Sequence, residues 1–209
     1  MILLLNYLTH PSSHGIDQKD IHQGRLPARY VHSTNAISKI TLNKTQITFL
    51  IALFYLNEEI GKSKSLRKAV PLKLVAVGGF VAVSYFHNRA STEDLDYMID
   101  PGLNSMTKIE GKLARAIKAV AYRKGYDEGW VNDNVRMFAV GDSAQPLFQE
   151  SVEQNVVLWR GKNLVIYAVK WEWSLARKVK RISSTGRDAD VSDAVALLRQ
   201  MVDDSKGPI

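Results

Sequence analysis

The pattern of hydrophobic and polar positions predicts secondary structure for most of the chain after residue 44. Apolar residues at three- and four-residue spacing predict helices over residues 45–61, 106–124 and 191–202. A nearly continuous apolar run at 72–77 predicts a buried strand. Two apolar runs joined by Arg-Gly-Lys-Asn, at 156–159 and 164–168, predict a β-hairpin that a helix at 171–181 follows.

Residues 1–44 lack this periodicity and carry several glycine, proline and serine residues. We therefore expect a loop-rich or partly disordered N-terminal extension, followed by one folded domain over residues 45–209. Its arginines and histidines make the extension basic, which fits either a solvated arm or an arm that contacts nucleic acid.

A glycine turn and a pair of acids stand out in the middle of the chain. The predicted strand at 72–77 stops at Gly78 and Gly79, where the backbone can turn sharply or approach another group closely. The apolar residues 80–86 predict a short buried helix. Asp94 and Asp96 then project from one face of a second strand, because side chains in a strand alternate. Two adjacent carboxylates repel each other, and a divalent cation relieves that repulsion.

The ordered set of residues resembles the nucleotidyltransferase superfamily, which has a polymerase-β-like fold. Within that superfamily it is most similar to the minimal or uncharacterised members associated with toxins and antitoxins. The resemblance is close over residues 72–100 and looser to about residue 200. It implies an α+β fold with a small mixed β-sheet flanked by helices and with further helices at the C-terminus.

The resemblance also implies roles for individual residues. Asp94 and Asp96 would be catalytic and would bind magnesium, as a two-ion Mg²⁺ site in an active enzyme. The nucleoside triphosphate would be held by the turn glycines, by a hydroxyl and by basic side chains; the matching positions are Gly78, Gly79, Arg89, Ser91, Thr92 and Lys178.

One expected element of such a site is missing from the predicted strands. Active relatives carry a third carboxylate on a later strand, opposite the aspartate pair, but the runs 156–159 and 164–168 contain no Asp or Glu. Glu153, Glu172 and Asp190 are the nearest candidates, and Asp190 also stands where an N-cap of the last helix belongs. Asn132 or Asp133 either points toward the expected active-site cleft or caps a short helix that runs to residue 138.

Bulk properties narrow the function classes. The net charge of +7 favours polyanionic partners such as nucleotides or RNA, although solubility alone also explains it. Cysteine is absent, which excludes disulfides and thiolate chemistry. The longest apolar run, at 47–56, is half the roughly 20 residues of a membrane span, and no signal peptide is recognisable. We expect a cytoplasmic protein.

Three functions remain open from the sequence. The first is a Mg²⁺-dependent nucleotidyltransferase that moves a nucleoside monophosphate to a hydroxyl group on RNA, protein or a small molecule and releases pyrophosphate. The second is a catalytically silent module with the same fold. The third is a nucleic-acid-binding protein whose binding ignores Asp94. The sequence leaves the acceptor, the preferred nucleotide and the oligomeric state open.

Overall fold

The computed structural model describes residues 44–137 and 141–205. These residues belong to the second of the two units, residues 1–42 and 43–209, into which the chain divides. The predicted extension at 1–44 therefore lies almost entirely outside the described residues.

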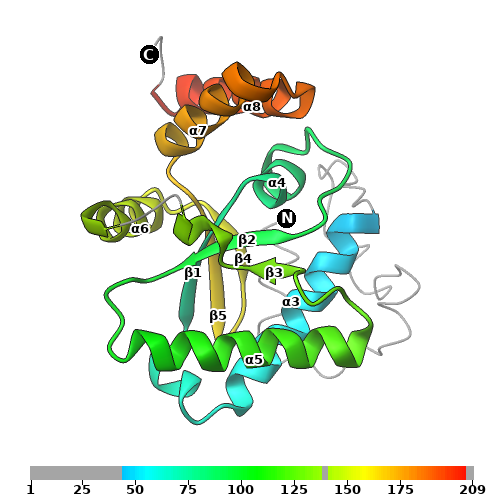
Figure 1. Ribbon diagram of the computed structural model, residues 1–209, viewed down its shortest axis with the longest axis vertical. Helices are drawn as coiled ribbons and strands as arrows, with labels where there is room; N and C mark the ends of the chain where they lie inside the picture. The colour runs from blue at the N-terminus through cyan, green and yellow to red at the C-terminus, as the bar shows by residue number, and fades with distance from the viewer. Residues whose placement is uncertain (1–43, 138–140, 206–209) are drawn as a thin grey trace, which may run out of the picture. The chain divides into compact units, whose positions relative to one another are not determined.

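The described part of the second unit has an α+β fold built on one five-stranded mixed sheet (Figure 1). Its strand order is β3-β2-β1-β5-β4, with β1 and β2 antiparallel, β1 and β5 parallel, β2 and β3 parallel, and β4 and β5 antiparallel. The strands are β1 (Leu72–Val77), β2 (Leu95–Ile99), β3 (Val131–Asn132), β4 (Val157–Arg160) and β5 (Leu164–Ala168). The helices are α3 (Lys44–Lys62), α4 (Gly79–Val81), α5 (Met106–Lys124), α6 (Ala144–Glu153), α7 (Trp171–Thr185) and α8 (Asp188–Ser205).

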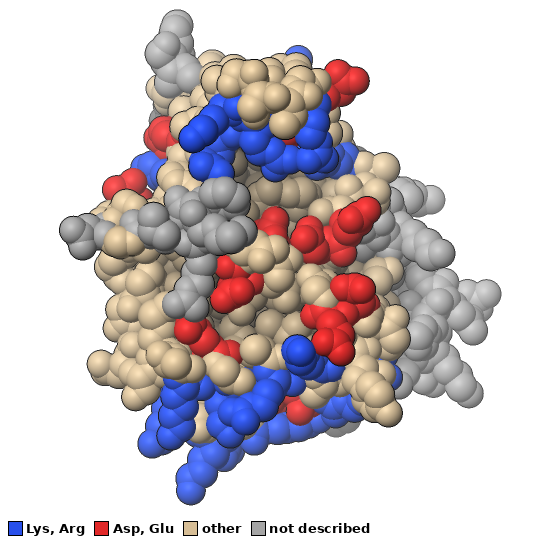
Figure 2. Space-filling model, viewed as in Figure 1, with Lys and Arg blue, Asp and Glu red and all other residues tan. Residues whose placement is uncertain are grey.

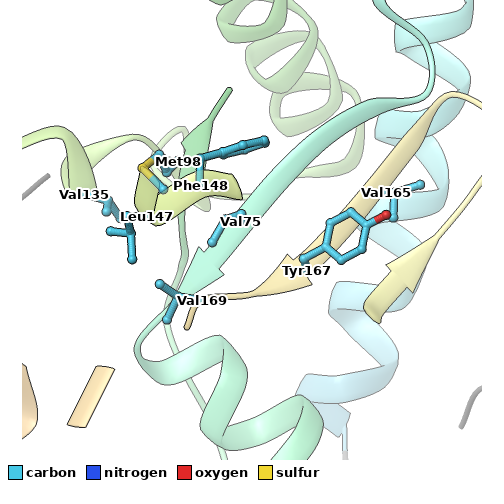
Figure 3. Packing of buried hydrophobic residues seen from close by; sticks show 8 residues of the cluster. All are labelled: Val75, Met98, Val135, Leu147, Phe148, Val165, Tyr167 and Val169. Carbon is cyan, nitrogen blue, oxygen red and sulfur yellow. The ribbon is translucent and has the colours of Figure 1, made fainter. Parts of the chain in front are cut away.

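One face of the sheet packs against α6. Figure 3 shows Val75 of β1 and Val169 after β5 beside Leu147 and Phe148 of α6, and all four side chains are buried. Met98 of β2 belongs to the same cluster. Asp96 lies two residues before Met98, so its side chain projects from the same face of β2. Leu95, Tyr97 and Ile99 alternate with these positions and are buried on the opposite side, as the alternation predicts. Asp94 lies just before the strand begins.

Helices α3 and α5 pack against each other. The predicted stripe of α5 is confirmed: Ile109, Leu113, Ala116, Ile117 and Val120 are all buried, and Gly125 ends the helix with a left-handed φ of 71°. For α3 the helix is confirmed but its apolar spacing does not mark the packed side. The apolar side chains buried there are those of Phe49, Ala52, Leu53, Leu56 and Ile60, whereas Phe54 is 36% exposed. This helix carries apolar residues on all its sides, so their spacing alone does not predict which side packs against the rest of the protein.

The short helix after the glycine turn is present, as α4 followed by a π-helical turn at Ala82–Phe86. Phe80, Val81 and Val83 are buried. His87 ends the segment with a φ of 55°, and its ring accepts or donates hydrogen bonds with Val83 and Gln46. His87 is thus a structural residue at a helix end.

The last two helices, α7 and α8, pack together as a pair. The predicted N-cap role of Asp190 is wrong, because α8 begins at Asp188 and Asp190 lies inside its first turn, fully buried. A buried acid so early in the helix needs a partner elsewhere in the fold, and that partner is Lys178 of α7.

Two elements escaped the sequence patterns. The two-residue strand β3 falls where we expected only an approach to a short helix, and α6 falls in a segment without an assigned element. No helix within the described ranges has both the length and the apolar character needed to span a membrane.

Candidate functional site

The aspartate pair lies beside the glycine turn. Asp96 of β2 is paired across the sheet with Val77, the last residue of β1. Gly78 follows with a φ of 70°, in a region that side chains disfavour, and a Cβ placed on Gly78 would lie 3.6 Å from Asp96 Oδ2. The antiparallel pairing of β1 with β2 therefore brings together two motifs that are about 15 residues apart in the chain.

The two carboxylates are close enough to affect each other. Burial raises the pKa of Asp96 above its usual value, and the negative charge of Asp94 raises it further. Hydrogen bonding by Asn132 and the positive charges of Arg181 and Lys178 act in the opposite direction without cancelling the rise. Asp96 is thus a half-buried acid whose charge is incompletely compensated, as expected of a site that takes a cation.

Asn132 lies beside the pair on the next strand. β3 runs parallel to β2 with Asn132 in register with Asp96, and Asn132 Nδ2 donates a hydrogen bond to Asp94 Oδ2 at 3.0 Å. Asn132 Oδ1 accepts a hydrogen bond from the backbone N–H of Asn134 at 3.1 Å, which fixes the direction of the amide. The structure supports both open roles for Asn132, because its amide nitrogen contacts Asp94 and its amide oxygen caps the short helix that begins at Asn134. An uncharged amide thus stands next to the two acids.

Thr92 leaves no room for a side chain at position 79, which is a glycine. A Cβ on Gly79 would collide with Thr92 Oγ1 and would lie 3.0 Å from Thr92 Cβ. Thr92 Oγ1 donates a hydrogen bond to the backbone carbonyl of Asp94 at 3.2 Å, which links the turn to the start of β2. Ser91 is exposed, so of the two predicted hydroxyl residues it is Thr92 that packs against the glycine turn.

Arg89 bridges the turn and the last helix. Its Nε and Nη2 donate to the two carboxylate oxygens of Asp193 at 2.8 and 2.5 Å, and Nη2 also donates to the carbonyl of Ala189 at 3.2 Å. Its Nη1 lies on the other side, 3.8 Å from the position of a Cβ on Gly79. Arg89 is therefore both an ion-pair partner of α8 and a neighbour of the glycine turn.

Lys178 belongs to the same charged cluster. It is 5% exposed, and its Nζ lies 2.8 Å from Asp190 Oδ1 and 2.6 Å from Asp193 Oδ2. Arg181 Nε lies 3.3 Å from the other oxygen of Asp190. Burial raises the pKa of Asp190, but the hydrogen bond and charge of Lys178, with the charges of Arg181 and Arg187, outweigh burial and leave that pKa below its usual value. Asp190 therefore remains ionised beside these cations.

The three third-acid candidates lie elsewhere. Glu153 is exposed at the end of α6, Glu172 is exposed and 3.8 Å from Lys170, and Asp190 is occupied by Lys178 and Arg181. Within residues 44–137 and 141–205 there is no group of three or more His, Cys, Asp or Glu side chains that could hold a metal ion. Any ion at the site would take protein ligands from Asp94 and Asp96 and complete its shell from water or substrate.

The charges have a clear arrangement on the surface. In Figure 2, basic side chains gather on the α7–α8 pair, acidic side chains gather below them over β2 and β3, and the surface between them is recessed. This arrangement agrees with the effect of Arg181 and Lys178 on the pKa of Asp96. A ligand that carries both a metal ion and phosphate groups complements both sides.

Comparisons of the chain with models of known protein families, with curated proteins and with solved structures found no match. What the site does must therefore be inferred from its own residues and their geometry.

Proposed function

We propose that this protein is a Mg²⁺-dependent nucleotidyltransferase that acts in the cytoplasm. It would transfer a nucleoside monophosphate from a nucleoside triphosphate to a hydroxyl group and release pyrophosphate. The observation that carries the proposal is the position of Asp96, next to Asp94, beside Gly78 of the glycine turn and within range of the positive charges of Arg181 and Lys178. Acids that bind a metal ion and a turn that can admit a phosphate are here within one small region.

The acids fit a magnesium ion. Mg²⁺ prefers carboxylate oxygens together with water and phosphate oxygens, and Asp94 and Asp96 supply the carboxylates at the start of β2. The raised pKa of Asp96 indicates that the negative charge is under-compensated in the protein alone. When bound, the ion would neutralise charge on the phosphates and help to align the attacking and leaving oxygens.

The surrounding residues supply groups that bind and orient phosphates. Backbone N–H groups that follow Gly78 at the start of α4 are available donors, and Ser91 is an exposed hydroxyl near them in sequence. Arg89 Nη1 faces the turn. Lys178 is committed to Asp190 and Asp193, so its contribution to the site would be its positive charge and the placement of the two acids.

In the proposed reaction, a hydroxyl oxygen of the acceptor bonds to the α-phosphorus while the bond from that phosphorus to the bridging oxygen of pyrophosphate breaks. The hydroxyl proton leaves to solvent or to a carboxylate at the site, and Arg89 offsets the charge that develops on the phosphates. RNA, protein and small molecules remain candidate acceptors, and the positive net charge favours a polyanion.

A second candidate function is a silent nucleotide-binding module, and Asn132 is the observation that favours it. An amide cannot accept a proton from an acceptor hydroxyl, and it contributes no charge to a second metal ion. With Asn132 in register with Asp96, the described strands place no third acid beside the pair. Such a module would bind the metal–nucleotide complex and use it as a signal.

Two measurements on the full chain test these functions. Titration of ATP, GTP, CTP and UTP with and without Mg²⁺ asks whether the site binds nucleotide, and α-labelled nucleotides with RNA, protein and cell extract ask whether label is transferred. The transferase requires Mg²⁺-dependent binding and transfer, both lost in Asp94→Asn. Binding without transfer supports the silent module. Binding that needs no Mg²⁺ and survives Asp94→Asn contradicts both.

A further inference from the structure

Arg89 and Asp193 are separated by 104 positions in the chain but form the closest charged contact at the site. Both carboxylate oxygens of Asp193 are used, one by Nε and one by Nη2 of Arg89. This two-point contact fixes the plane of the guanidinium group as well as its position, which a single ion pair would not do.

Asp193 is itself held rigidly. Its side chain is 3% exposed, Lys178 Nζ lies 2.6 Å from Oδ2, and Asn88 Nδ2 donates to Oδ1 at 3.0 Å. Three side chains, two from the segment before β2 and one from α7, thus meet at the Asp193 carboxylate of α8. A buried carboxylate with this many donors has little freedom to move, so the orientation it gives to Arg89 is also fixed.

The remaining nitrogen of Arg89 is directed at the glycine turn. Nη1 has no hydrogen-bond acceptor among the described residues, and it lies 3.8 Å from the position of a Cβ on Gly79. A guanidinium with two nitrogens engaged and one presented at a turn of backbone N–H groups is well suited to bind an oxygen of a phosphate group.

We infer that Asp193 is a positioning residue that holds Arg89 so that Nη1 contacts a phosphate group bound at the Gly78–Gly79 turn. The inference rests on the proposed function for the presence of a phosphate ligand, and it adds a residue that the sequence motifs did not single out. Since Asp193 lies on α8, the same contact couples occupancy of the turn to the attachment of α8.

The direction in which Asp193→Asn changes anion affinity distinguishes this inference from a purely electrostatic effect. Asp193→Asn removes a negative charge near the anion site, so charge alone predicts tighter anion binding. Positioning predicts the opposite, because the amide loses the charge-assisted contact and releases Arg89. We expect binding of inorganic tripolyphosphate, measured by calorimetry without metal on the full chain, to weaken by about tenfold or more.

Matched variants complete the test. Asp188→Asn removes an exposed acid from the first turn of the same helix and should leave tripolyphosphate binding unchanged or slightly tighter. Arg89→Lys keeps the positive charge but removes the planar guanidinium group and its several N–H donors, so it should weaken binding as Asp193→Asn does. The double variant should bind no more weakly than Arg89→Lys alone, because both substitutions remove the same two-point contact between Arg89 and Asp193. Equal or tighter binding by Asp193→Asn, or additive losses, overturns the inference.

A measurement on the unaltered protein guards against variants that do not fold. Hydrogen exchange should slow at the backbone amides of residues 188–194 when tripolyphosphate is added, and unchanged exchange there would count against the inference. Wild-type protein that binds no tripolyphosphate also overturns it. The proposed function fails separately, if tripolyphosphate behaves as described but nucleoside triphosphates show no Mg²⁺-dependent binding.

Discussion

Asp96 lies directly beside Gly78: a Cβ placed on the glycine would be 3.6 Å from Asp96 Oδ2. This proximity follows from the pairing of Asp96 with Val77, because Val77 is the last residue of β1 and Gly78 comes directly after it. A cation held by the acid and an anion held at the turn would therefore be near neighbours. Each would reduce the electrostatic cost of binding the other.

The first prediction is that Asp96→Asn stabilises the metal-free protein while it removes metal binding. The pKa of Asp96 is raised in the folded state, first by burial and then by Asp94, so the ionised carboxylate destabilises the fold at neutral pH. Because Asp96 is only half-buried and solvent screens its charge, the neutral isostere should increase the free energy of unfolding by less than about 1 kcal/mol. Thermal unfolding with and without Mg²⁺ and ATP measures both effects.

Glu93→Gln is the matched control for that prediction, because Glu93 is an exposed acid in the same segment. It should change neither the metal-free stability nor the stabilisation by Mg²⁺ and ATP. If Asp96→Asn proves less stable than the wild type and keeps the ligand-induced rise in melting temperature, Asp96 is a structural residue.

The second prediction concerns Asn132. Asn132→Asp places a third carboxylate beside Asp94 and Asp96, which should lower the stability of the metal-free protein and tighten binding of a divalent cation by about tenfold. Cation titration followed by melting temperature tests it. Asn134→Asp adds the same charge at an exposed position nearby and should do neither. Equal behaviour of the two variants would show that Asn132 does not face the metal site.

The third prediction tests the contact that restricts Gly79. Gly79→Ala should cost about 1–3 kcal/mol of folding free energy, because the added methyl group collides with Thr92. Thr92→Ala in the same chain removes the colliding hydroxyl, so the double variant should recover part of that loss. Urea unfolding of the two single variants and the double variant gives the coupling energy. Strictly additive losses would contradict the packing of Thr92 against the turn.

The fourth prediction is a pH dependence of stability that involves Lys178. The pKa of Asp190 is lowered in the folded state, so its contribution to stability is present above the unfolded-state pKa of about 3.9 and is lost as the pH falls through the folded-state pKa. Lys178→Met should cost about 3–5 kcal/mol at pH 7, because it removes the buried cation that pairs with both Asp190 and Asp193.

The difference in unfolding free energy between wild type and Lys178→Met should then narrow as the pH is lowered from 5 toward 3, since protonated Asp190 needs no cation. Lys180→Met changes an exposed lysine of the same helix and should cost less than about 0.5 kcal/mol at every pH. A cost for Lys178→Met that stays constant with pH would mean that lost packing, and not the ion pairs, sets its effect.

The strand β1, the helix α5 and the glycine turn were predictable because their signals are local. A continuous apolar run, a regular apolar stripe and a glycine pair each depend on residues close together in the chain. The position of Asp96 on the face of β2 that also carries Met98 followed from the alternation of a strand for the same reason, whereas Asp94 lies just before β2 begins.

The features that escaped prediction depend on distant partners. β3 has two residues and exists because it pairs with β2, so no run of its own marks it. The burial of Asp190 and Asp193 depends on Lys178 and Arg89. The sequence pattern of an acid near the start of a helix favours a cap, and only the folded structure shows that these acids pair with cations.

The most direct test of the central claim is to count the Mn²⁺ ions that bind, with Mn²⁺ as a paramagnetic substitute for Mg²⁺. Electron paramagnetic resonance of free Mn²⁺ should show binding to the full chain that tightens when a nucleoside triphosphate is added, and Asp94→Asn and Asp96→Asn should each abolish it. Mn²⁺ binding that is absent from the wild type with the nucleotide present, or undiminished in both variants, would contradict the assignment of these aspartates to a metal–nucleotide site.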